Sequence, residues 1–175
     1  MKTLRKMDLD SMQREFQVLQ NPEKVLGGDG IGGFVSSINI VGGTITNWNY
    51  NGDTYAVFNG SDGKCLVLDG VNVGHDTLPL QQDDTACYFG GKIRIGGAWT
   101  NFNIQDLLHE YGHYLQAQSS VGSITSSLSY SANVICSAID MAFNDPDHMN
   151  MPFEQDATNR GNAYGASNYG FPKSY

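Results

Sequence analysis

Residues 103–118 read NIQDLLHEYGHYLQAQ. Their apolar side chains recur at spacings of three and four, which predicts an amphipathic helix with a stripe of Ile104, Leu107, Leu108, Tyr111 and Leu115. Asn101 or Asn103 can cap its first turn with a side-chain oxygen. Gly112 opposes the pattern, because a glycine inside a helix costs about 1 kcal/mol relative to alanine. We therefore expect another backbone, or a substrate, to approach closely at Gly112.

This helix also carries a pair of histidines, His109 and His113, with Glu110 between them. Side chains at positions i and i+4 lie on one helix face, so both imidazoles can bind a single zinc ion. Glu110 can then reach a zinc-activated water and take its proton as the water attacks an amide carbonyl. Two of the four histidines fall in this motif, which favours a zinc site over a structural histidine pair.

A third protein ligand is expected, because catalytic zinc usually has three. The favoured candidate is Glu154, which follows Pro152 at the start of a predicted helix over 153–164. From residue 29 onward the only other glutamate is the one in the histidine motif, so the longer acidic side chain at 154 stands out. His148, in an acidic loop, is the rival third ligand.

Taken together, these residues resemble the Glu-zincin group of metallopeptidases, and more narrowly small bacterial proteins that carry an HEYGHYLQ helix. The resemblance rests on residues 107–116 and on the segment Glu154-Gln155-Asp156-Ala157. It implies that His109, His113 and Glu154 bind Zn²⁺. It also implies a peptide or protein substrate lying antiparallel to an edge strand near Lys92–Ile95.

The outer partners of the ligands depart from the resemblance. Many Glu-zincins place an aspartate four residues after the ligand glutamate, where it orients the first histidine, but this chain has Thr158 there and Asp156 as an alternative. The residue that would stabilise an oxyanion is also left open, with Tyr130, His148, Tyr164 and Tyr169 as candidates.

Upstream of the helix, residues 34–95 alternate β-rich runs with turn residues, which predicts hairpins. Asn51-Gly52 is a strong turn signal because both residues tolerate positive φ. Lys92–Ile95 alternates charged and apolar residues and is expected to be an edge or half-exposed strand. Downstream, a further helix is predicted over 123–143. The expected fold is therefore α+β and zincin-like, with a small, mainly antiparallel sheet followed by three helices.

The first 26 residues differ from the rest, because they contain no glycine and hold Lys2, Arg5, Lys6, Arg14 and Lys24. An apolar face of Leu9, Met12, Phe16 and Leu19 is followed by Gly27-Gly28. This segment resembles a double-glycine leader, the type that peptidase-containing ABC exporters bind and cut. We expect a leader over 1–28, a metallopeptidase domain over 29–175 and secretion. The alternative is a surface helix with a glycine C-cap.

Composition excludes several other functions. The net charge is -8 and the basic residues are scattered, so nucleic acid is not an expected partner. No apolar window is long enough to span a membrane. The three cysteines, Cys65, Cys87 and Cys136, lack CxxC spacing, which favours unpaired thiols and leaves one disulfide open if the protein is exported.

The expected function is hydrolysis of peptide bonds outside the producing cell. Two alternatives come from other classes of protein. One is an exported toxin or signalling peptide whose zinc site is structural or vestigial. The other is a non-enzymatic binding module that uses the glycine- and asparagine-rich strands.

Overall fold

A computed structural model describes residues 32–50, 52–77, 81, 83–120 and 148–170. The predicted leader over 1–28, the predicted helix over 123–143, Tyr130 and Cys136 lie outside these ranges. The domain boundary expected at residue 28 therefore stays a prediction.

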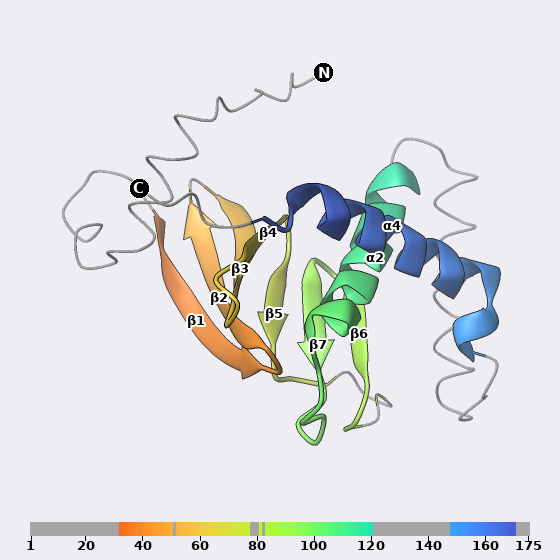
Figure 1. The fold of residues 1–175 in the computed structure, drawn as a ribbon, viewed down its shortest axis with the longest axis horizontal. Helices are drawn as coiled ribbons and strands as arrows, with labels where there is room; N and C mark the ends of the chain where they lie inside the picture. Colours follow the sequence, from red (N-terminus) through yellow and green to blue (C-terminus); the bar gives the residue numbers. More distant parts are fainter. Residues whose placement is uncertain (1–31, 51, 78–80, 82, 121–147, 171–175) are drawn as a thin grey trace.

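The first four strands form an antiparallel meander, with neighbours in chain order (Figure 1). They are β1 (Gly32–Ile40), β2 (Gly43–Tyr50), β3 (Asp53–Gly60) and β4 (Cys65–Asp69). The turn between β2 and β3 contains Gly52 with φ of 85°, as its turn signal predicts. The turn between β1 and β2 likewise contains Gly42 with φ of 86°.

A second, smaller sheet follows, and it corrects the prediction of a single sheet. It contains β5 (Asn72–Gly74), β6 (Ala86–Phe89) and β7 (Lys92–Ile95), in the order β5-β7-β6. The chain leaves the meander at Gly70, whose φ is 78°. The next strand, β5, pairs in parallel with β7. Lys92–Ile95 is consequently the central strand of this sheet, and β6 lies at its edge. The prediction of an edge strand at Lys92–Ile95 is wrong, although its outward side chains are half-buried as expected.

The helix predicted over 103–118 is confirmed as α2 (Ile104–Ser120). Asn103 caps it, because its side-chain oxygen accepts a hydrogen bond of 2.8 Å from the backbone N–H of Gln105. The last helix is α4 (Pro152–Asn168), with proline at its start, and a short 3₁₀ helix, η2 (His148–Asn150), precedes it. The expected three helices are also corrected, since the described ranges hold two α-helices.

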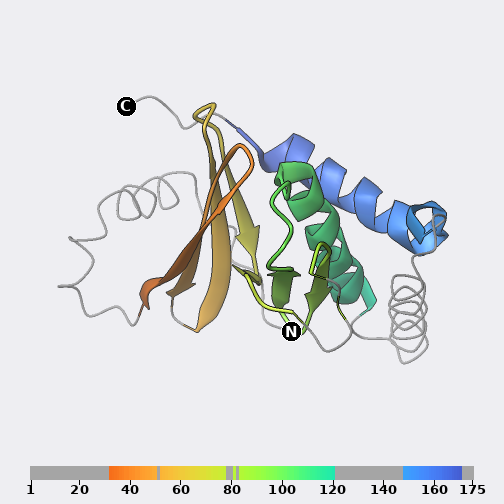
Figure 2. The ribbon, with the colours of Figure 1, turned by 90° about the horizontal axis from the view of Figure 1, so that it is seen from below.

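Helices α2 and α4 cross with their backbones in contact, on the same side of the larger sheet (Figure 2). A Cβ atom at Gly112 would overlap the carbonyl oxygen of Ala157, and one at Gly161 would overlap that of Leu108. The close approach expected at Gly112 is therefore made by the backbone of α4. Any larger side chain at either position has to push the helices apart.

One continuous core joins both sheets to the helices. It includes Phe58 and Leu66 from the larger sheet, Ile93 from the smaller one, and Leu107 and Tyr111 from α2. The apolar stripe predicted for α2 thus belongs to this core, and its Leu108 packs against Gly165 of α4. Within the described residues, no helix is both long and apolar enough to cross a bilayer. Cys65 and Cys87 are free thiols.

The two sheets are also joined by a polar contact at Asn47 of β2, which is 1% exposed. Its side-chain amide donates to the carbonyl of Val73 in β5 at 2.6 Å, and its oxygen accepts from the Val73 N–H at 2.8 Å. The Asn47 side chain therefore satisfies the backbone groups of Val73 on the edge of β5 that does not pair with β7.

Replacing Asn47 with leucine should destabilise the fold by about 2–5 kcal/mol, because it leaves the buried N–H and carbonyl of Val73 unpaired. Urea unfolding followed by circular dichroism measures this change. Asn59→Leu on β3 is the matched control at an exposed position, where about 0.5 kcal/mol or less is expected. Equal effects of the two substitutions would contradict the role of Asn47.

Candidate metal centre

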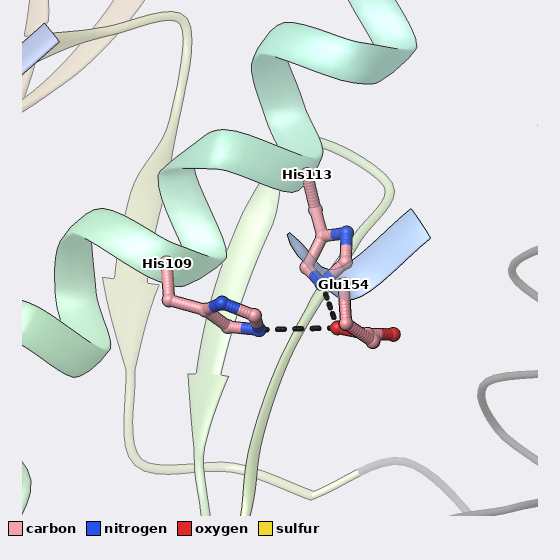
Figure 3. A group of neighbouring side chains, drawn as sticks. All are labelled: His109, His113 and Glu154. Carbon is pink, nitrogen blue, oxygen red and sulfur yellow. Dashed lines mark hydrogen bonds and ion pairs between the residues drawn. The ribbon is translucent and has the colours of Figure 1, made fainter. Parts of the chain in front are cut away.

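Three side chains, His109 and His113 from α2 and Glu154 from the first turn of α4, converge on one point (Figure 3). The Nε2 atom of His109 lies 3.2 Å from Oε2 of Glu154, and Nε2 of His113 lies 3.0 Å from the same oxygen. One potential ligand atom from each of the three residues lies within 4.8 Å of the others. The structure therefore brings together the three residues that the sequence singled out as ligands.

This donor set fits a zinc ion. Two imidazole nitrogens and a carboxylate oxygen are common zinc ligands, and donors bound tetrahedrally at about 2.0–2.1 Å lie about 3.3 Å apart. The two imidazole-to-carboxylate distances are close to that spacing. Adjacent lone pairs of nitrogen and oxygen repel one another unless a proton or a metal ion lies between them. The arrangement can thus bind a cation.

Each histidine has a partner on its other ring nitrogen. Nδ1 of His109 is 2.9 Å from the hydroxyl oxygen of Thr158, and Nδ1 of His113 is 2.9 Å from Oε1 of Gln116. Thr158 thus occupies the place where the resemblance led us to expect an aspartate. Asp156 instead accepts a hydrogen bond from Gln116. Gln116 was not among the predicted site residues, although its i+3 spacing from His113 on a helix was a usable signal.

Glu110 lies beside the three converging side chains and is buried, with 7% of its surface exposed. Burial raises the pKa of its carboxyl overall, although the charges of His113 and His109 and a hydrogen bond from the backbone N–H of Tyr88 act in the opposite direction. Its Oε2 atom has no hydrogen-bond partner within the described part of the chain. A buried carboxylate oxygen without a partner costs free energy, which is typical of a group kept for chemistry.

The electrostatics of His113 follow from its surroundings. Burial alone lowers the pKa of this imidazole, but the hydrogen bond to Glu154 and the charges of Glu110 and Glu154 raise it overall. The side chain of Glu154 is 1% exposed, while those of His109 and His113 are 14% and 11% exposed. The carboxylate is therefore the most buried of the three proposed ligands.

His148, the rival third ligand, lies near the other oxygen of the Glu154 carboxylate. Its Nε2 atom is 3.7 Å from Oε1, the carboxylate oxygen that does not face the other two imidazoles. It does not belong to the group of converging ligand atoms, and its Nδ1 atom is buried without a hydrogen-bond partner among the described residues. The structure therefore places His148 next to the centre and outside its donor set.

Two tyrosines considered for oxyanion stabilisation are engaged elsewhere. The hydroxyl of Tyr164 donates to the carbonyl of Val67 at 2.7 Å, and that of Tyr169 donates to Asp62 at 3.1 Å. Tyr130 lies outside the described ranges. His148 is thus the candidate that lies beside the centre.

Comparisons with models of known protein families, with curated proteins and with solved structures found no match to this chain.

Proposed function

We propose that this protein is a zinc-dependent peptidase of the Glu-zincin type that acts outside the producing cell. The observation that carries the proposal is the convergence of His109, His113 and Glu154 beside a buried glutamate with an unpartnered oxygen. The described residues supply three donors, which is the number typical of catalytic zinc sites, whereas structural sites usually have four. This count favours an enzyme over a structural zinc site.

In this proposal His109, His113 and Glu154 hold the metal. Zinc, when bound, lowers the pKa of water to about 7 and polarises a carbonyl group. Glu110 accepts the proton of the attacking water and later gives it to the leaving amine. Burial of Glu110 supports this role, because it leaves the free carboxylate oxygen without competing solvent.

We further propose that β6 binds the substrate backbone. Among the described strands, β6 is paired on one side only, with β7, and α2 packs against it. The backbone N–H of Tyr88 in β6 contacts Glu110, so this edge lies next to the proposed general base. An extended peptide can add to such an edge through main-chain hydrogen bonds. This assignment moves the substrate from Lys92–Ile95 to Ala86–Phe89.

The proposal is tested by metal analysis and by metal removal. We expect one zinc ion per chain and hydrolysis of a fluorescently labelled unfolded protein such as casein. A chelator should abolish hydrolysis, since activation of the water is lost, and added zinc should restore it. Fluorescence release measured before chelation, after chelation and after re-addition of zinc gives the result.

The outcomes separate the three classes of function. Hydrolysis that persists in chelator would contradict the proposal. A second outcome is a protein that binds zinc but shows no chelator-sensitive hydrolysis. If X-ray absorption then shows four protein ligands, a toxin or signalling protein with a structural site is favoured. Protein that binds no zinc would favour a binding module.

A further inference from the structure

The side chain of Gln116 links the two helices that supply the proposed ligands, α2 with its two histidines and α4 with its glutamate. It is 5% exposed and makes three hydrogen bonds, one to each of His113, Phe153 and Asp156. Its Nε2 atom donates to the carbonyl oxygen of Phe153 at 2.7 Å and to the carboxylate of Asp156 at 2.9 Å. Phe153 immediately precedes Glu154. The amide of Gln116 therefore hydrogen-bonds to the helical turn that carries the third proposed ligand.

The orientation of this amide follows from its partners. A carbonyl and a carboxylate only accept hydrogen bonds, so the NH₂ group of Gln116 has to face them. The oxygen of Gln116 then has to face His113, and because an amide oxygen only accepts, Nδ1 of His113 has to carry a proton. In the neutral imidazole this leaves the lone pair on Nε2, the atom through which His113 would bind a metal in place of its hydrogen bond to Glu154.

This hydrogen-bond network continues to Arg160, one helical turn further along α4. The carboxylate of Asp156 that accepts from Gln116 also accepts from Nε of Arg160 at 2.7 Å. These two hydrogen bonds and the charge of Arg160 outweigh burial and lower the pKa of Asp156. Asp156 therefore stays ionised and is a strong acceptor for Gln116.

We propose that Gln116 is the positioning residue of the metal centre, which sets the tautomer of His113 and clamps the first turn of α4, and with it Glu154, against α2. The inference rests on the proposed function, because it concerns the same site. Gln116 touches neither substrate nor reacting atoms. It acts through His113 and Glu154, so its effect should appear in metal binding itself.

Two substitutions separate the two tasks. Gln116→Met keeps the length of the side chain and removes all three hydrogen bonds. Gln116→Glu keeps an acceptor for the Nδ1–H of His113 and loses both donors to α4. Gln118→Met is the matched control, because Gln118 lies on the same helix and is exposed.

Zinc affinity is measured by competition with a chromophoric chelator. We expect Gln116→Met to bind zinc about 10–100-fold more weakly than the wild type, the range typical of losing an outer partner. Gln116→Glu should lose less affinity, because it keeps an acceptor for His113 and loses only the donors to α4. Gln118→Met should match the wild type. In the zinc-loaded protein, NMR should show faster exchange of the His113 Nδ1–H in Gln116→Met and a protected proton in Gln116→Glu.

A second measurement needs no metal. The backbone N–H of Gln155 donates to the carbonyl of Met151 in the first turn of α4. Its hydrogen exchange in the metal-free protein should be at least about 10-fold faster in both variants, because the turn has lost its clamp. Wild-type exchange at Gln155 together with wild-type zinc affinity in Gln116→Met would overturn the inference. A wild type that binds no zinc but shows the expected exchange pattern would count against the proposed function and leave the clamp standing.

Discussion

Glu110→Gln should abolish hydrolysis while zinc stays bound. The amide fills the same buried space beside His109 and His113, but it cannot accept the proton of the attacking water. General bases contribute about 10²- to 10⁴-fold to a rate, so turnover should fall by at least about 100-fold. Turnover of a labelled peptide and the zinc content of the same sample, measured side by side, give the result.

Asp83→Asn is the matched control, since it makes the same carboxylate-to-amide change at an exposed position. It should leave both turnover and zinc content unchanged. Turnover of Glu110→Gln at the wild-type rate would remove Glu110 from its proposed role. A loss of zinc together with a loss of turnover would assign Glu110 to metal binding instead.

Glu154→Ala should lower zinc affinity by more than about 100-fold, beyond the range typical of an outer partner. The reason is geometric, because Oε2 of Glu154 lies within 3.2 Å of both imidazole nitrogens. His148→Ala should leave zinc affinity nearly intact, because its imidazole faces the opposite carboxylate oxygen at 3.7 Å. Competition with a chromophoric chelator measures both affinities.

His75→Ala serves as the control, since it removes an exposed imidazole that does not belong to the centre. Thermal unfolding of the metal-free variants checks that each one still folds. The reverse order of effects, with His148→Ala losing zinc and Glu154→Ala keeping it, would make His148 the third ligand. The Glu-zincin assignment would then fail.

Sequence reasoning worked best where the information is local. Helix α2 was predictable from its apolar spacing and its asparagine cap, because both depend on residues within a few turns. Gly112 also predicted a tertiary contact. A glycine that lowers helix stability indicates a neighbour too close for a side chain. Glu154 was selected by its place after Pro152 and by the scarcity of glutamate.

The sheets were predicted less well, for a physical reason. Turn signals identify hairpins, in which consecutive strands pair, and the larger sheet is of this kind. The smaller sheet depends on the parallel pairing of β5 with β7, between strands separated by β6 in the chain. β5 spans only Asn72–Gly74 and is held on its other side by the side chain of Asn47. No local pattern encodes such a contact.

Helix spacing could have paired Gln116 with His113, but the contacts that these outer partners make between α2 and α4 were beyond local patterns. Thr158 offers a hydroxyl where the resemblance suggested a carboxylate, and only the crossing of α2 and α4 shows that the hydroxyl reaches His109. Gln116 looked like one polar residue among several at the end of a helix. Its three partners come from two helices, so its role became visible only when both were placed.

The glycine contact between α2 and α4 has a consequence for the rotation of α4 about its own axis. Ala157, Gly161 and Gly165, the buried small residues of α4, meet α2 at intervals of four residues, and Glu154 precedes Ala157 on the same helix face. A slip by one residue would turn the helix by about 100° and point the carboxylate away from the imidazoles. A side chain as small as a methyl group at Gly161 blocks the native orientation, so the direction of Glu154 is determined two turns away from it.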